Sequence, residues 1–413
     1  MSLKDFQTIL TPQEKVGALA FYQKPTPGFP QGRIFPATFS RPDVGATSGA
    51  TVFDKDGNLE ELAEDAPDWE QGSGCTKILM RPQAQNLWGY SGDVSNFYNP
   101  APATLSNEGP LEIFPQDDWG LFTQNGAGNN IGIIYSLLTA GQNYIISFYV
   151  KISASDDYIG LRETGNGVGV FRISTETITT AGGGLSSGKV LDTTNPDIKR
   201  VVLYGTAGVG GNLFLVLCST AGNSGVDDGG KIQITGLQVQ QTSVYSGYIP
   251  TSGAALTRSA NDVILSNMVS NEVFGAGSVG SIIIKLKGYT GDSTPLSNFL
   301  LDSSGDTLLN LVMRDYGATV FKYQDTSSPT TNTHLALNDD HALVYVFDGL
   351  NMKIYADSGL VLDFDAVSYQ GDIDQFTFPK SPNGQLDYSL VGITPIALTE
   401  AQAIAAIAEA ESL

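Results

Sequence analysis

The chain has 413 residues, with 22 Lys or Arg against 43 Asp or Glu, so its formal net charge is −21. A surface this acidic repels phosphate backbones, and we expect no nucleic-acid partner. The length predicts two large domains plus a small one, and 41% hydrophobic residues are enough to fill cores, which excludes a disordered chain. The longest apolar runs, such as residues 131–138, are too short to cross a membrane, and we expect no signal peptide.

The first 40 residues differ in composition from the rest. Four prolines lie between residues 25 and 36 and alternate with Phe29, Phe35 and Phe39. Proline fixes φ and removes a backbone donor, so this segment is expected to be an extended arm rather than a helix or a central strand. The three phenylalanines have no local core, so we expect them to dock on another surface, either of this chain or of a partner subunit. We interpret residues 1–40 as an attachment arm.

Residues 41–87 are expected to form a small β-hairpin unit. The segment ATVFDKDGNLEEL predicts two short strands joined by a turn at Lys55–Asn58. Its alternating acidic residues also suggest a calcium loop. However, the glycine falls at the wrong loop position and no bidentate Glu closes the loop, so the hairpin is the better interpretation.

Residues 88–258 and 259–398 each show many short runs of alternating apolar and polar residues between Gly- and Asn-rich breaks. That pattern is typical of half-buried antiparallel strands and predicts an all-β chain with two β-sandwich domains, the first suited to a jelly roll. Residues 399–413 are expected to form a C-terminal helix with Thr399 as its N-cap. Its weakly apolar face is predicted to consist of Ala401, Ile404, Ala405 and Ile407.

The stretch Gly236–Val263, which we call the strap, joins these two domains. It begins as a strand and then breaks at Gly247 and Pro250. A plain linker seldom holds two tyrosines, an isoleucine and an arginine so close together. We therefore predict a packed segment in which Tyr248 and Ile249 are buried and Arg258 meets a carboxylate or backbone carbonyls.

Several segments, taken in order, resemble a pattern found in tailed-bacteriophage virion proteins. They are Arg41 with Ala46–Thr47, KILMRPQAQNL at 77–87, GLQVQ at 236–240, GYIPT at 247–251, TRSAND at 257–262 and LTEAQ at 398–402. The resemblance covers about 41–413. It implies a carbohydrate-binding-module-like jelly roll followed by a concanavalin/laminin-G-like sandwich. Gln240 stands where the family usually has Glu, which marks a diverged member.

The resemblance implies a virion location and a structural role, as a head fibre, tail fibre or capsid decoration subunit. Its arm would attach it and its sandwiches would project outward, where they bind surface glycans. Repeated attachment points imply a homo-oligomer, a dimer or trimer, with capsid or tail proteins as partners. Two alternatives stay open: a receptor-binding adhesin for host glycans, and a polysaccharide-degrading enzyme.

The sequence holds two histidines, His334 and His341, and no H-E-x-x-H motif. We therefore expect a protein that is not an enzyme and has no cofactor, with a structural Ca²⁺ as an open alternative. Acidic residues that suit such an ion are Asp227, Asp228, Asp302 and Asp306.

A carbohydrate site is predicted early in the first large domain. Aromatic rings can stack on pyranose rings while amides and carboxylates bind the hydroxyls. The candidates are Trp88, Tyr98, Asn99, Asp118 and Trp119. The competing interpretation is that these residues pack in a core or an interface. The two cysteines, Cys75 and Cys218, are expected to be free thiols, with Cys218 buried in a strand.

Overall fold

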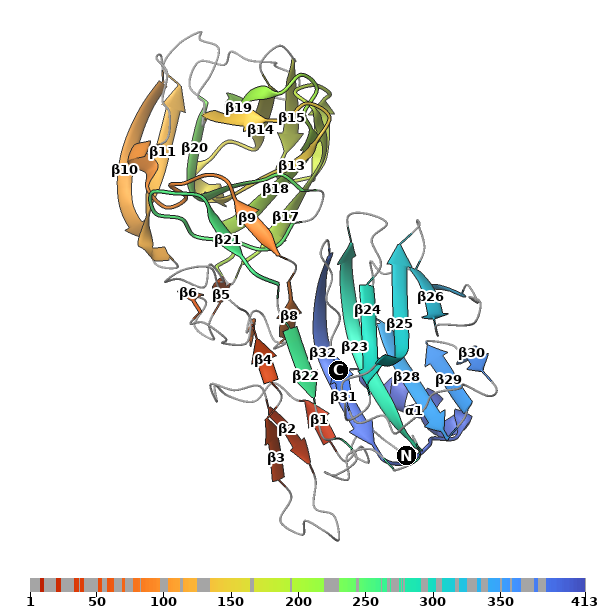
Figure 1. Ribbon diagram of the computed structural model, residues 1–413. Helices are drawn as coiled ribbons and strands as arrows, with labels where there is room; N and C mark the ends of the chain where they lie inside the picture. Colours follow the sequence, from red (N-terminus) through yellow and green to blue (C-terminus); the bar gives the residue numbers. More distant parts are fainter. Residues whose placement is uncertain are drawn as a thin grey trace.

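The computed structural model describes most of the chain from residue 51 onward and a few strands before it. The described residues are 8–10, 20–23, 33–36, 38–40, 51–53, 58–62, 69–70, 77–81, 83–96, 103–111, 114–124, 134–163, 167–193, 195–218, 230–242, 245–260, 262–265, 268, 275, 277, 279–290, 296–301, 307–315, 319–324, 333–335, 341–349, 351–356, 359–364, 375–377 and 384–412. Within these, the chain folds as two β-sandwiches and one C-terminal helix (Figure 1), which confirms the predicted all-β class.

The first sandwich packs a six-stranded antiparallel sheet on a five-stranded one. The six-stranded sheet has the order β10 (Ala103–Leu111), β11 (Phe114–Gln124), β20 (Lys231–Gln240), β13 (Asn143–Lys151), β18 (Ile198–Thr206) and β17 (Leu185–Asp192). The five-stranded sheet has the order β12 (Ile134–Leu138), β19 (Gly211–Cys218), β14 (Tyr158–Glu163), β15 (Val168–Arg172) and β16 (Thr177–Thr180).

The alternation of side chains along each strand builds the core between these two sheets. In β13, Tyr144, Ile146, Phe148 and Val150 join the inter-sheet core, as do Val201 and Leu203 of β18. The intervening residues of both strands point to the outer face of the six-stranded sheet. That outer face carries Tyr149 and Ile198 in a second buried cluster with Trp119 and Tyr248. The six-stranded sheet is therefore apolar on both faces over part of its area.

The second sandwich also has two antiparallel sheets. One has the order β3 (Arg33–Pro36), β2 (Ala20–Gln23), β1 (Thr8–Leu10), β32 (Gly384–Thr394), β23 (Val279–Thr290), β28 (His341–Asp348), β29 (Asn351–Ala356) and β30 (Gly359–Phe364), with β8 (Lys77–Met80) on β32 and β7 (Trp69–Glu70) on β8. The other has the order β27 (Thr333–Leu335), β26 (Thr319–Gln324), β25 (Thr307–Asp315), β24 (Leu296–Leu301), β31 (Gln375–Thr377), β22 (Asp262–Leu265) and β4 (Thr38–Ser40).

The described strands of the first 40 residues belong to this second sandwich. β1 pairs with β32, β2 and β3 extend that sheet, and β4 pairs with β22. The segment is extended, as expected, but it is built into a sheet rather than standing apart as an arm. An extended backbone satisfies its N–H and C=O groups by such pairing, and Pro36 is tolerated because it ends a strand. Phe35 lies in β3 and Phe39 in β4, whereas Phe29 lies outside the described residues.

Residues 41–87 do not form one separate unit in the structure. The predicted hairpin is present, as β5 (Thr51–Phe53) and β6 (Leu59–Glu61). β8 joins the second sandwich, while β9 (Ala84–Asn86) pairs with β21 (Leu256–Arg258) beside the first. The chain passes from the second sandwich to the first between β8 and β9, and it returns between β21 and β22 (Figure 1).

The predicted C-terminal helix is α1 (Glu400–Glu411), which begins with a capping box between Thr399 and Gln402. Its buried face consists of Ala403, Ala406, Ile407 and Ala410, which pack on β28 and its neighbours. Of the four residues predicted for this face, only Ile407 is buried. The prediction failed because alanine occupies nearly every side of this helix, so the apolar period does not fix its rotation.

Candidate functional site

The strap is held on the first sandwich by side-chain amides. Gln238 of β20 accepts a hydrogen bond from the Ile249 N–H at 2.7 Å and donates to the Gly247 carbonyl at 2.8 Å. Asn86 donates to the Ile249 carbonyl at 2.9 Å and accepts from the Val239 N–H at 3.1 Å. Buried backbone polar groups need such partners, and here the two amides supply what a neighbouring strand would otherwise provide.

A second set of hydrogen bonds surrounds the Tyr248 hydroxyl. Its oxygen lies 2.9 Å from both Ser91 Oγ and Asp117 Oδ2. The phenol has a single hydrogen, so it donates to one of these two oxygens at a time, and the Ser91 hydroxyl in turn donates to the Thr251 carbonyl at 3.5 Å. Burial raises the pKa of Tyr248 well above its usual value. Burial also raises the pKa of Asp117, although Tyr248 and Arg200 act in the opposite direction.

Arg200 of β18 lies under the strap and is 2% exposed. Its guanidinium carbon is 4.3 Å from the ring centre of Tyr149 and 4.9 Å from that of Tyr248. Its Nη1 donates to the Gly236 carbonyl at 2.6 Å and its Nη2 to Ser147 Oγ at 2.7 Å. A planar fork that also stacks on aromatic rings suits this position far better than a lysine would.

Gly236 makes room for that guanidinium. It has φ of +60° in a β-bulge where β20 carries one extra residue opposite β13. A Cβ at this position would lie 2.7 Å from Tyr149 Cδ2 and 3.2 Å from Arg200 Nη1. Only glycine fits here, both for its backbone conformation and for the space.

The β5–β6 hairpin closes over the same region. Thr51 Oγ1 donates to the Tyr248 carbonyl at 2.9 Å, and Arg81 Nη1 donates to the Thr51 carbonyl at 2.9 Å. Leu59 packs against the buried cluster that contains Trp119 and Tyr248. Burial and the charge of Asp117 raise the pKa of the Glu61 carboxyl. The outer face of the six-stranded sheet is therefore covered by the chain itself over β11, β20 and β13.

Of the five predicted carbohydrate-binding residues, the described part of the chain contains Trp88, Asp118 and Trp119. Trp119 is fully buried under the hairpin, so its ring offers no face to a sugar and it serves the core instead. Trp88 is half-buried against the inter-sheet core and donates to the Tyr90 carbonyl at 3.0 Å. Asp118 accepts a hydrogen bond from Asn107 at 2.9 Å. Tyr98 and Asn99 lie outside the described residues.

Two tyrosines that the sequence analysis did not select remain partly open on the outer face of the six-stranded sheet. They are Tyr204 of β18 and Tyr245 in the strap, both half-buried. The sequence pattern that could have identified Tyr204 is the alternation in KRVVLYG at 199–205. It places Tyr204 on the opposite face of the sheet from the core residues Val201 and Leu203.

The predictions made for the strap are confirmed where they concern burial. Tyr248 is 2% exposed and Ile249 is fully buried, as is Arg258 in β21. The expected contact of Arg258 with a carboxylate or carbonyls stays a prediction. Cys218 is a free buried thiol, as expected, and Cys75 lies outside the described residues.

Metal-binding residues do not gather in the described part of the chain, where no group of three or more His, Cys, Asp or Glu is suited to hold an ion. The four aspartates named as calcium candidates all lie outside it. Among the described residues, no helix is long and apolar enough to cross a membrane.

No protein-family model and no curated protein matches this chain. Several solved structures are similar at low identity. A Trypanosoma rangeli sialidase has a TM-score of 0.29 and 9% identity, over 86% of this chain and 64% of the sialidase. A truncated AlyQ with CBM32 and alginate lyase domains has a TM-score of 0.25 and 9% identity, over 76% and 99%. Domains LG4-5 of the mouse laminin alpha1 chain have a TM-score of 0.21 and 10% identity, over 67% and 92%.

Two of these neighbours are named for a CBM32 domain and for laminin domains LG4-5. The neighbours also overturn one expectation. Because sialidases and a GH43 protein from Bacillus licheniformis are among them, the prediction that the chain is not an enzyme is contradicted. At these TM-scores the likeness carries no argument for a particular reaction, and this chain spans less than two thirds of the sialidase.

Proposed function

We propose that this chain is a structural subunit of a tailed-bacteriophage virion, a fibre or decoration protein of the head or tail. The proposal is supported by the motif segments that carry the resemblance. GLQVQ and GYIPT meet in space, where Gln238 bonds to Gly247 and Ile249. The residues that mark the resemblance are thus the ones that fix the strap, as expected if this chain shares the family's architecture.

The pairing of the N-terminal strands supports a particular orientation of the subunit on the particle. β1 and β4 are hydrogen-bonded into the second sandwich and not into the jelly roll (Figure 1). In the proposed virion, the N-terminal segment and its sandwich contact capsid or tail proteins, and the jelly roll projects outward. Repeated sites on the particle make the subunit a dimer or trimer.

The test is mass spectrometry of phage particles purified on a density gradient from the host that encodes this chain. The proposal predicts that the protein bands with the particles in constant ratio to the major capsid protein. A chain lacking residues 1–40 should fail to band with them, and circular dichroism of the purified variant must show that loss of β1–β4 has not unfolded it. Absence of the full-length protein from intact particles would refute the virion role.

A further inference from the structure

The strand β17 forms one end of the six-stranded sheet, and no described strand pairs with its free side. Its regular pairing with β18 runs from Ser187 to Asp192, because an extra residue, Ser186, interrupts the register before it and a turn follows it. A sheet edge of this kind presents N–H and C=O groups that can pair with a strand of another chain. The free side of β17 therefore needs some means of closure.

The pairing of β17 with β18 determines which backbone groups of β17 point outward. Along an antiparallel pair, residues bonded to the neighbouring strand alternate with residues whose N–H and C=O groups point away from it. The Val190 N–H bonds to Glu176 rather than to β18, so Val190 is one of the outward residues. By the same alternation Gly188 and Asp192 are the next outward residues on either side. Val190 is therefore the middle one of these three.

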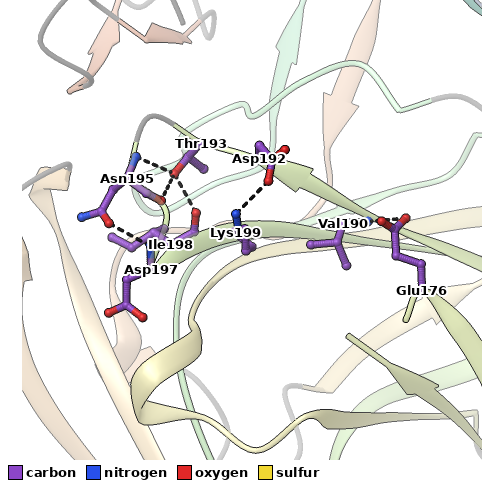
Figure 2. Close-up of polar contacts among 8 residues, drawn as sticks. All are labelled: Glu176, Val190, Asp192, Thr193, Asn195, Asp197, Ile198 and Lys199. Atoms are coloured by element: carbon purple, nitrogen blue, oxygen red, sulfur yellow. Dashed lines mark hydrogen bonds and ion pairs between the residues drawn. The ribbon is translucent and has the colours of Figure 1, made fainter. Parts of the chain in front are cut away.

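The side chain of Glu176 occupies this middle position (Figure 2). Glu176 lies in the turn between β15 and β16, which belong to the five-stranded sheet, and its Oε2 accepts the Val190 N–H at 3.2 Å. The hydrogen bond thus crosses from one sheet to the other at the edge of the sandwich. A strand that paired with β17 would need the same N–H as the donor to one of its own carbonyl groups, so the carboxylate competes directly with such a strand.

The backbone of Glu176 gives independent support for a role of its side chain. Its φ is +53°, and it is the one described residue other than glycine with a positive φ. Glycine adopts this conformation without steric cost, whereas a glutamate is strained in it. The Glu176 side chain is exposed, so it contributes little packing in return. Its bond to Val190 is a contribution that glycine could not make.

The edge itself is held in a fixed, extended form. Where β17 ends, Thr193 Oγ1 donates to the carbonyl oxygens of Asn195 and Ile198 at 2.9 and 2.7 Å, which closes the turn into β18 (Figure 2). On the core side, a Cβ at Gly188 would overlap the Phe171 ring, so that ring packs directly on the β17 backbone. A preformed edge lowers the entropic cost of pairing with another strand.

We propose that the free edge of β17 is a pairing surface for β17 of a second copy of this chain, and that the Glu176 side chain keeps this surface closed. The edge is complementary to itself. A two-fold axis at Val190 would pair the two Val190 residues with each other, and Gly188 of each copy with Asp192 of the other, so that outward N–H groups face outward C=O groups. The carboxylate on the central N–H blocks this register. The proposal goes beyond the virion role and does not depend on it.

The test is the molar mass of the full-length chain, measured by light scattering after size-exclusion chromatography over a range of concentrations. Glu176→Gly removes the carboxylate and relieves the strained φ, so the variant should keep its fold. We expect its mass at high concentration to be about twice that of the original chain, and to fall to the original value on dilution. Hydrogen exchange of the Val190 amide in this variant should be fast when dilute and slow when concentrated.

The matched control is Glu176→Gln, which loses the same charge but keeps an oxygen that can accept the Val190 N–H. Its mass should equal that of the original chain at every concentration. Three results would each overturn the proposal: an unchanged mass for Glu176→Gly, association of Glu176→Gln to the same extent, or association of Glu176→Gly in which the Val190 amide still exchanges rapidly.

Discussion

The Gln238 side chain forms hydrogen bonds with the backbone around Ile249 as a neighbouring β-strand would. Its side-chain oxygen accepts the Ile249 N–H at 2.7 Å, and its amide nitrogen reaches the carbonyl two residues earlier at 2.8 Å. A side chain of β20 thereby satisfies backbone N–H and C=O groups of an irregular segment, as an adjacent strand does at the edge of a sheet. This explains how Tyr248 and Ile249 lie buried without belonging to either sheet.

Replacement of Gln238 should destabilise the chain strongly. Gln238→Ala leaves the buried Ile249 N–H and the partly buried Gly247 carbonyl without their partner, which costs about 2–4 kcal/mol. Urea unfolding followed by circular dichroism measures this. Gln241→Ala, at an exposed position three residues on, is the control and should change stability little. Equal stability of the two variants would mean that the amide does not hold the strap.

Arg200→Lys should cost about 2 kcal/mol, because lysine keeps the charge but loses the forked hydrogen bonds and the stacking on two tyrosines. The matched control is Arg172→Lys. Arg172 also lies over a tyrosine ring and binds Asp157 at 2.7 Å, but its side chain is 41% exposed. A surface pair of this kind contributes about 0–1 kcal/mol. Thermal unfolding of the two variants compares them, and a larger loss for Arg172→Lys would contradict the account.

Gly236→Ala and Gly141→Ala separate backbone strain from crowding. Both glycines have positive φ, +60° and +77°, but a Cβ meets the Tyr149 ring at 2.7 Å in the first case and nothing within 4 Å in the second. The left-handed conformation costs about 1–2 kcal/mol in each variant. Gly236→Ala should therefore lose clearly more stability in urea unfolding, and similar losses would show that the bulge tolerates a side chain.

Asp117→Asn should stabilise the chain at neutral pH. The folded-state pKa of Asp117 is raised above its usual value of 3.8, so the stability that the protonated group contributes is present below that value and is lost as the pH rises through the folded pKa. Asparagine keeps an acceptor for Tyr248 without the charge. The stability difference between the variant and the original chain should grow from pH 3.5 to pH 7 in urea titrations. A difference that shrinks over this range would contradict the raised pKa.

The sequence predicted local structure well where a residue type has one main structural role. The prolines and glycines of the strap indicated a break, and its large apolar residues indicated burial, which Tyr248 and Ile249 show. It led to a wrong prediction where the same residue type serves equally in a core and in a binding site. On sequence grounds Trp119 suits a sugar or a core, and its packing with Tyr149, Ile198 and Tyr248 decides for the core.

Contacts between residues far apart in the sequence were the other feature that could not be predicted. Nothing local to residues 1–40 indicates that β1 lies beside β32, almost four hundred residues away in sequence. Likewise Asn86 and Gln238 are ordinary polar residues until the fold sets both against Ile249. The Gln240 departure from the phage pattern proved structural, since its amide binds Ser246 at 2.6 Å.

The most direct test of the packed strap is amide hydrogen exchange at Ile249 in the full-length chain. If Gln238 holds the Ile249 N–H as described, this amide should exchange as slowly as those of β20, and Gln238→Ala should speed its exchange at least tenfold more than that of Ile146 in β13. Exchange of Ile249 at the rate of a solvent-exposed linker would contradict the packed strap, and with it the physical link between the two sandwiches.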